Sequence, residues 1–435
     1  MDPLLYSPIL ALALLLLLAS GLWVAVSLIG VALIGMLVFA DAPIDLVMPS
    51  TIWGAVSGWT LTALPLFVWM GEILYRTKLA DDLFQGLAPW TSRLPGRLLH
   101  VNVIGCGIFA AVSGSSAATA ATVGQMSLPE LKRRGYAEPI SIGSLAASGT
   151  LGLLIPPSII LIVYGVSANV SIARLFLAGV LPGILLIGMF MAYIMIWALL
   201  NKRKMPPPEP PLPFMEKFRR LHLLLPTVLL ILGVIGSIYT GIATATEAAT
   251  LGVVGSLLVA LLSRSLTWTN FKASLHGATR TSCMIGFIIA AAAFLSVVMG
   301  YAGIPRALAN WIGTINLSPY QLIFALTILY LILGCFLDGI SMVVLTTAVI
   351  MPMVEAAQID LIWFGIFIVL VVESAQITPP VGFNLFVVQG LTGHNIVYVA
   401  KAVLPFFIVL CLGIVIITVF PGIATWLPKT MFNAP

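Results

Sequence analysis

The chain has 435 residues, of which 60% are hydrophobic and only 8% are charged, and its mean hydropathy is +1.13. This composition excludes a water-soluble globular fold and places most of the chain in hydrocarbon. The net charge of +5 does not indicate a nucleic-acid partner, because the basic residues are spread between apolar segments and form no basic domain. The four cysteines lack CxxC spacing, which argues against a disulfide framework or a zinc site.

Apolar segments long enough to cross a bilayer recur along the chain. A hydrocarbon core about 30 Å thick needs about 20 apolar residues per helix. Candidate spans lie near residues 4–20, 22–40, 57–75, 137–166, 175–200, 221–240, 242–262, 280–300, 361–390 and 402–425. The sequence therefore predicts an all-α, multi-pass integral membrane protein.

Two further apolar stretches, 98–130 and 317–354, do not fit a single crossing. Basic residues flank the first stretch on both sides, at positions 93, 97 and 132 to 134. Because basic residues favour the cytoplasmic side, both ends of this stretch are expected there. Its Gly- and Ser-rich centre, SGSSAATAATVG from Ser113 to Gly124, would accommodate a reversal. We predict a re-entrant helical hairpin that enters and leaves by the cytoplasmic face.

The distribution of basic residues also orients the chain. With the first hairpin on the cytoplasmic side, all but three of the 20 Lys and Arg residues are cytoplasmic, the exceptions being Arg174, Arg306 and Lys429. Both termini are then expected in the periplasm. The Pro-rich segment 205–220 is expected to be a cytoplasmic linker between two halves, 1–204 and 221–435.

The two halves correspond to one another at an offset of roughly 223 to 225 residues. At this offset Pro156 and Pro157 align with Pro379 and Pro380, and the amphipathic segments 79–92 and 304–315, both expected to lie in the membrane interface, also correspond. Each half contains an odd number of crossings, so the second half is expected to be inverted and its hairpin to enter from the periplasm. Inverted repeats with interrupted helices are typical of secondary transporters, which bind substrate and ions near the bilayer midplane.

The two Pro pairs lie inside the spans 137–166 and 361–390. A Pro-Pro pair removes two backbone donors and ends a helix, which leaves carbonyl groups of the preceding turn free. In a bilayer such groups are tolerated where they are buried in protein or line a wet cavity. We therefore predict two broken helices whose breaks lie beside the hairpin tips. The alternative is structural: a Pro pair can mark a simple kink, and a Gly- and Ser-rich cluster can be a helix-packing surface.

Free carbonyls and hydroxyls at the tips and breaks would form an all-oxygen environment that suits a hard cation such as Na⁺. Half-helix N-termini at the same depth would favour a substrate carboxylate. The hydroxyl groups come from Ser113, Ser115, Ser116, Ser341 and Thr378.

Four acidic residues lie within or close to apolar segments, where an ionised side chain is costly and usually faces a partner or an ion path. Asp338, at the second hairpin tip, is the strongest functional candidate. Glu247 and Glu373 are open between a structural role and an ion path, and Glu72 is expected to pair with Arg76. The sequence contains no Walker A loop, dinucleotide fingerprint, GxSxG elbow or metal cluster, so we predict a transporter and not an enzyme.

The segments SGSSAATAATVG, LIPPSI, TEAAT and ITPPVGFNLF resemble the large membrane subunit of the tripartite ATP-independent periplasmic (TRAP) transporters, along essentially the whole chain. The resemblance implies a Na⁺-coupled importer of small organic acids, of the dicarboxylate, keto acid or sialic acid class, in the bacterial inner membrane. It also implies a small four-helix membrane subunit, expected as a separate polypeptide, and a periplasmic substrate-binding protein. The implied mechanism is an elevator, in which the hairpins and broken helices move together against a scaffold of the other helices.

Site residues follow by matching these motifs. At least two Na⁺ sites are expected, formed by Ser113, Ser116, Gly149, Gly152, Pro156, Gly339, Thr378 and Pro379. Substrate contacts are expected from Ser115, Ser116, Asp338, Ser341 and Asn384. Structural roles or an ion path are expected for Glu247, Pro157, Pro380 and Glu373. A Na⁺/dicarboxylate symporter that works without a binding protein is the alternative, because a similar hairpin fold would share these features.

Overall fold

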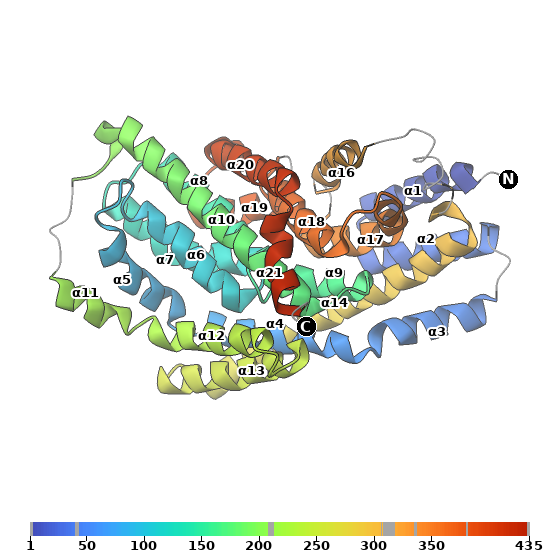
Figure 1. The fold of residues 1–435 in the computed structure, drawn as a ribbon, viewed down its shortest axis with the longest axis horizontal. Coiled ribbons are helices and arrows are strands. Elements are labelled where there is room, and N and C mark those ends of the chain that lie inside the picture. Colours follow the sequence, from blue (N-terminus) through green and yellow to red (C-terminus); the bar gives the residue numbers. More distant parts are fainter. Residues whose placement is uncertain are drawn as a thin grey trace.

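The computed structural model describes residues 3–39, 43–207, 213–305, 307, 318–334, 337–379 and 382–432, and its regular structure in these ranges is entirely helical (Figure 1). The first half contains α1 (Pro3–Ala19), α2 (Val24–Phe39), α3 (Ile44–Val56), η1 (Trp59–Thr62), α4 (Ala63–Tyr75), α5 (Leu79–Thr91), α6 (Leu99–Ser113), α7 (Ser116–Arg133), α8 (Glu138–Thr150), η2 (Leu151–Leu153), α9 (Ile159–Ser167), α10 (Ile172–Leu200) and η3 (Lys202–Lys204). The second half contains α11 (Phe214–Leu221), α12 (Leu225–Tyr239), α13 (Ala245–Leu262), α14 (Trp268–Tyr301), α16 (Pro319–Leu333), α17 (Gly339–Ala356), α18 (Leu361–Gln376), α19 (Phe383–Thr392), α20 (Ile396–Val419) and α21 (Gly422–Phe432). The predicted all-α fold is confirmed.

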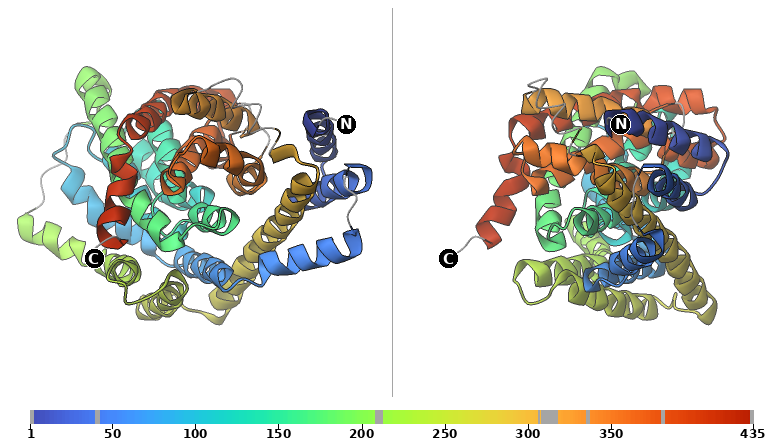
Figure 2. Two further views of the ribbon diagram at one scale, coloured as in Figure 1. Left: turned by 45° about the vertical axis from the view of Figure 1, so that its right-hand side comes forward. Right: turned by 90° about the vertical axis from the view of Figure 1, so that its right-hand side faces the viewer.

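The helices form two groups. We call the first group the scaffold; it comprises α1 to α4 and α11 to α14, and in it α4 packs on α13 while α14 packs on α2, α3 and α4. We call the second group the bundle; it comprises α6 to α10 and α16 to α21. The scaffold helices curve around one side of the bundle (Figure 2). The amphipathic helix α5 connects the groups, because it packs on both α6 and α11.

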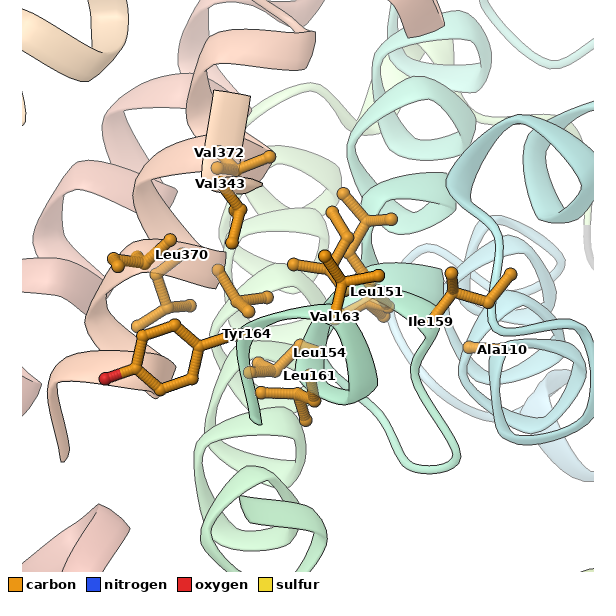
Figure 3. Close-up of a cluster of buried hydrophobic side chains, with 14 of the residues drawn as sticks. Ala110, Leu151, Leu154, Ile159, Leu161, Val163, Tyr164, Val343, Leu370 and Val372 are labelled. Carbon is orange, nitrogen blue, oxygen red and sulfur yellow. The ribbon is translucent and has the colours of Figure 1, made fainter. Parts of the chain in front are cut away.

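The centre of the bundle is apolar. Leu151 and Leu154, from the segment that follows α8, lie near Val343 of α17 and near Leu370 and Val372 of α18, and all five side chains are buried (Figure 3). Lipid is as apolar as these side chains, so close packing, not removal from water, holds such a core together. The same apolar centre surrounds the breaks described below.

Helical hairpins and broken helices occupy the segments where the sequence predicts them. α6 and α7 pack against each other and are separated only by Gly114 and Ser115. α16 and α17 form the corresponding pair, joined by a 2.5 Å hydrogen bond between the hydroxyls of Tyr330 and Thr346. α8 is separated from α9, and α18 from α19, by the segments that carry the Pro pairs. Most of the predicted second interfacial segment, 304–315, and Pro380 lie outside the described residues.

The two broken helices pair head to tail. The hydroxyl of Tyr164, near the end of α9, donates a 2.7 Å hydrogen bond to the carbonyl of Leu361, at the start of α18. His394, just after α19, contacts Glu138, at the start of α8, with 3.2 Å between Nε2 and Oε2. The two broken helices therefore run in opposite directions through the bundle, which is the relation that inverted halves would have.

Several elements differ from the sequence expectation. α3 was not predicted, because Asp45 and Pro49 interrupt its apolar pattern, yet it packs along α14 (Figure 1). The last part of the linker 205–220 is helical, in α11. The predicted last span, 402–425, is instead α20 followed by the separate helix α21. Among the described residues, the single helices long and apolar enough to cross a membrane are α10, α13, α14 and α20, and the other predicted spans are shorter or divided by breaks.

Candidate functional site

The tip of the first hairpin is a tight turn stabilised by hydroxyl groups. Gly114 has φ +58°, a left-handed conformation that favours glycine, and Ser115 caps α7 by accepting a hydrogen bond from the amide of Ala118. The hydroxyl of Ser113 lies 2.7 Å from that of Thr119, which donates a 2.7 Å hydrogen bond to the carbonyl of Ser115. The tip thus holds three oxygen-bearing groups within hydrogen-bonding distance of one another.

The first break packs directly on this tip. A Cβ added to Gly152 would lie 2.6 Å from the carbonyl oxygen of Ser115, and one added to Gly114 would lie 2.9 Å from the carbonyl oxygen of Pro157. Gly149 similarly faces α7, where an added Cβ would lie 2.7 Å from the Cβ of Ala120. Glycine at these positions lets carbonyl groups of the tip and the break approach closely. The structure therefore brings together the predicted residues Ser113, Ser115, Ser116, Gly149, Gly152, Pro156 and Pro157.

The tip of the second hairpin is closed by its own carboxylate. Asp338 caps α17: its Oδ2 accepts hydrogen bonds of 3.1 and 3.2 Å from the amides of Ile340 and Ser341, and its Oδ1 accepts one from the hydroxyl of Ser341. Both predicted substrate ligands at this tip are therefore bonded to each other. Their direct contact with a substrate stays a prediction.

The second break lies beside this tip. A Cβ added to Gly339 would lie 2.8 Å from Nε2 of Gln376, the last residue of α18. In the break itself, the hydroxyl of Thr378 donates a 2.6 Å hydrogen bond to the carbonyl of Ser374. Pro379 follows, and α19 begins after Gly382, which has φ +28°. The predicted residues Gly339, Thr378 and Pro379 thus lie at one junction between hairpin and break.

Four half-helices begin near the middle of the bundle, and they form two side-by-side pairs. Gly339 at the start of α17 lies against Ile160 at the start of α9, where an added Cβ would be 3.0 Å from Cδ1 of Ile160. α7 packs on α19 in the same way: Gly124 and Leu391, equally far from their helix starts, are in contact. Each pair therefore presents two helix N-termini at one depth.

The two pairs differ in how their N-termini are satisfied. In the α9 and α17 pair, Ser158 and Asp338 cap the helices. In the α7 and α19 pair, Ser115 caps α7 through a 3.4 Å hydrogen bond, much as Ser158 caps α9 through one of 3.3 Å, but among the described residues no side chain caps α19. Free N–H groups and the helix dipole attract anions, so the α7 and α19 pair is the better candidate for an anion site.

Two buried polar side chains at this open pair have no hydrogen-bond partner among the described residues. Asn384, in the first turn of α19, has 0% of its surface exposed, and neither Oδ1 nor Nδ2 has a hydrogen-bond partner among the described residues. The hydroxyl of Ser116, in the first turn of α7, is buried and also without a described partner. Buried polar groups are normally hydrogen-bonded, so both side chains are available to bind a ligand. The sequence predicted both residues but did not distinguish this pair of N-termini from the capped one.

The remaining acidic residues have separate positions. Glu72 pairs with Arg76 at 2.8 Å, as predicted. Glu247 forms a capping box with Thr244 at the start of α13, accepting 2.8 Å hydrogen bonds from the amide and hydroxyl of Thr244, which matches the structural alternative for this residue. Glu373 is fully buried in α18, and neither of its carboxyl oxygens has a hydrogen-bond partner among the described residues.

A cavity of about 1000 Å³ separates the bundle from the scaffold on the side where α9 ends. It is lined by α3, η1, the loop between α12 and α13, α14, and the segment from α9 to α10, with polar groups from Thr60, Asn169, Ser171, Thr244 and Ser296. The residues of the hairpin tips do not line it, although Val344 of α17 does. The cavity therefore adjoins the bundle without containing the predicted binding residues.

Comparisons with known proteins give consistent similarities. Residues 11–423 match the family described as "Tripartite ATP-independent periplasmic transporter, DctM component". The chain is 34% identical over 372 residues to the C4-dicarboxylate TRAP transporter large permease protein DctM of Pseudomonas aeruginosa, covering 85% of this chain and 86% of that protein. It is 28% identical over 416 residues to the sialic acid TRAP transporter large permease protein SiaM of Vibrio cholerae, covering 95% and 96%. The solved structure of the Alcanivorax borkumensis YdaH transporter shares the fold, with a TM-score of 0.63 at 13% identity over 97% of this chain and 99% of that one.

Proposed function

Because the chain belongs to the DctM family, the large membrane subunit of the tripartite ATP-independent periplasmic transporters, we propose that it imports small organic acids with Na⁺. Family membership itself makes the chain a multi-pass membrane transporter and not an enzyme. Na⁺ coupling, the substrate class, the partners and the elevator movement are parts of the proposal. It is supported chiefly by the packing of the first break on the first hairpin tip, where Gly152 leaves room for the carbonyl of Ser115.

The oxygen groups at each junction fit Na⁺. The first junction offers the Ser113 hydroxyl, the Ser115 carbonyl and carbonyls freed at the break, and the second offers the Thr378 hydroxyl and carbonyls beside Pro379. A Cβ at Gly152 would fill the space beside the Ser115 carbonyl, so glycine is required for such a site. The proposal therefore has two Na⁺ sites, one at each junction, and these bind the transported ions.

The substrate anion is proposed to bind at the open N-termini of α7 and α19. Ser115, Ser116 and Asn384 provide side chains there, and the unpaired amide of Asn384 can donate to a carboxylate. Asp338 and Ser341 would contribute at the α9 and α17 pair, where their hydrogen bonds order the second hairpin tip. Relatives named for C4-dicarboxylates and sialic acid support the organic-acid class.

The cavity is proposed to be the route from the periplasm to the bundle. Its lining includes the ends of α9 and α12, which the distribution of basic residues places on the periplasmic side along with both termini. A periplasmic binding protein would deliver substrate here, and a separate small subunit would pack against the scaffold in the inner membrane. The bundle would then carry ions and substrate past the scaffold, the two halves being inverted copies.

Uptake into proteoliposomes tests the proposal. Vesicles would contain this chain with its small subunit, with or without an inward Na⁺ gradient and a loaded binding protein. Uptake should require both, and Ser116→Ala should weaken it, whereas Asp338→Asn, which retains a capping side chain, should be milder. Uptake with Na⁺ alone would identify a symporter that needs no binding protein. Uptake at the same rate with and without a Na⁺ gradient would contradict the proposed Na⁺ sites.

A further inference from the structure

Glu373 is a carboxyl group with no described hydrogen bond in the centre of the bundle. Its side chain has 0% of its surface exposed, and neither carboxyl oxygen has a hydrogen-bond partner among the described residues. Its neighbours along α18, Leu370 and Val372, belong to the apolar core (Figure 3). An ionised carboxylate in such surroundings is very unfavourable unless a cation or several donors compensate it.

The polar group beside the carboxyl is the Thr150 side chain, at the end of α8. The hydroxyl of Thr150 is directed at the carbonyl of Ala147, 2.7 Å away, so its oxygen is able to accept a hydrogen bond from a protonated Glu373. At the offset that aligns Pro156 with Pro379, Thr150 aligns with Glu373. The pair therefore consists of equivalent positions of the two halves, which meet where the halves face each other.

Charged groups on the elements packed against α18 do not compensate this carboxyl. The charged or basic residues on or next to α18, those elements and α8 are Arg174, Lys202, Lys401, Lys429, His394, Asp338, Glu355, Asp360 and Glu138, and in the part of the chain that the structure describes none of them is hydrogen-bonded to Glu373. The hydroxyls of Tyr164 and Tyr330 are bonded to Leu361 and Thr346. The other titratable groups there are Tyr193, Tyr320, Tyr398 and Cys411, and none of them is hydrogen-bonded to Glu373 among the described residues.

The surroundings of the Glu373 carboxyl fit a bound proton better than a bound metal ion. A hard cation takes several oxygen ligands, whereas Thr150 supplies one hydroxyl beside this carboxyl. A neutral carboxylic acid needs one acceptor for its O–H group, and the Thr150 oxygen is such an acceptor. An ionised carboxylate would receive no hydrogen bond in the observed geometry, since neither oxygen has a partner among the described residues.

We propose that Glu373 is a proton-binding site, which holds the carboxyl in its neutral form and donates a hydrogen bond to Thr150. The proton is bound to a carboxyl oxygen of Glu373, and the hydroxyl proton of Thr150 remains directed at the carbonyl of Ala147. Binding or release of the proton forms or breaks only the carboxyl O–H bond. The site lies beside the first proposed Na⁺ junction, because Thr150 stands between Gly149 and Gly152, but it uses none of the ligands proposed for that junction. It adds a titratable position to the part of the molecule that we propose to move.

Infrared spectroscopy of the purified full chain tests this without measuring transport. At neutral pH, the wild-type protein should show the carbonyl stretching band of a protonated carboxylic acid, and Glu373→Gln should lose that band. Asp338→Asn is the matched control and should retain it. Glu373→Gln should also keep the wild-type thermal midpoint, because a neutral amide replaces a neutral acid.

Substitutions of Thr150 test the hydrogen bond. Thr150→Val removes the acceptor and should move the band to higher frequency, whereas Thr150→Ser should leave it in place. Absence of the acid band in wild-type protein, or its persistence in Glu373→Gln, would overturn the proposal. A carboxylate band that shifts on adding Na⁺ would overturn it in favour of a metal site. Because none of these measurements involves uptake, they can fail or succeed independently of Na⁺-coupled import.

Discussion

Glycine at position 152 allows the first break to contact the first hairpin tip. An alanine Cβ there would lie 2.6 Å from the Ser115 carbonyl oxygen and 2.9 Å from the Thr119 hydroxyl, so the tip must shift. Overpacking of this kind costs about 1–3 kcal/mol. We expect Gly152→Ala to weaken the apparent Na⁺ affinity of uptake by roughly 5- to 150-fold. Gly188→Ala, with nothing within 4 Å of its added Cβ, is the control and should behave as wild type.

Asn384 distinguishes an anion site from a packing position. Its amide is buried and unpaired at an uncapped helix start, so Asn384→Asp would place a negative charge where a substrate carboxylate is proposed to bind. We expect this substitution to abolish uptake, and Asn384→Ala to raise the KM with a smaller effect on kcat. Concentration-dependent uptake in proteoliposomes measures both. Equal losses from the two substitutions would indicate a structural role instead.

How far single residues could be predicted from the sequence depended on the type of residue. The Pro pairs and the Gly114 turn were predictable, because a missing N–H group or a left-handed φ has a local cause. The predicted contact of Asp338 with substrate stays a prediction; its role as a helix cap was not predicted, since an acidic residue at a helix start has both uses. The contact between Thr150 and Glu373 was not predicted, because it depends on how the halves pack.

The arms of the second hairpin are connected by a hydrogen bond between elements. Tyr330 of α16 is fully buried, and its hydroxyl contacts that of Thr346 in α17, which also donates to the carbonyl of Met342. Tyr330→Phe leaves Thr346 with its second partner, so the expected cost is about 0.5–1.5 kcal/mol. We expect a lower thermal midpoint and faster hydrogen exchange in α16. Tyr320→Phe, at an exposed position of the same helix, should change neither.

At the level of elements, periodicity and breakers predicted the bundle better than the scaffold. The hairpins and broken helices carry strong local signals, and their observed ends lie within a few residues of the predicted ones. α3 was missed because Pro49 stands inside it, although α14 packs along its length. The residues of α11 were predicted to be part of the linker, because a Pro-rich segment precedes them. Tertiary contacts decide such segments, and a sequence pattern does not contain them.

The whole molecule combines a symmetric bundle with less symmetric contacts to the scaffold. Within the bundle, α7 packs on α19 as α9 packs on α17, and α8 packs on α20 as α10 packs on α18. Towards the scaffold the halves differ: α6 packs on α4, whereas in the second hairpin α17 packs on α14. A rigid bundle that slides past the scaffold would break only the contacts between bundle and scaffold, and would keep the contacts within the bundle. The contact between α4 and the first hairpin tip is therefore the place to test movement.

Gly71 of α4 packs against the tip, where an added Cβ would lie 3.0 Å from the carbonyl oxygen of Ser113 and 3.3 Å from its Cα. These positions are close enough for a disulfide. In a background with the native cysteines replaced, oxidation of Gly71→Cys with Ser113→Cys should stop uptake, and reduction should restore the rate of the unoxidised protein. Gly252→Cys with Met70→Cys joins two scaffold helices that already touch, so its oxidation should have no effect. If the disulfide-linked protein takes up substrate as fast as the same protein after reduction, the tip does not leave α4. An elevator movement of the bundle past this helix is then excluded.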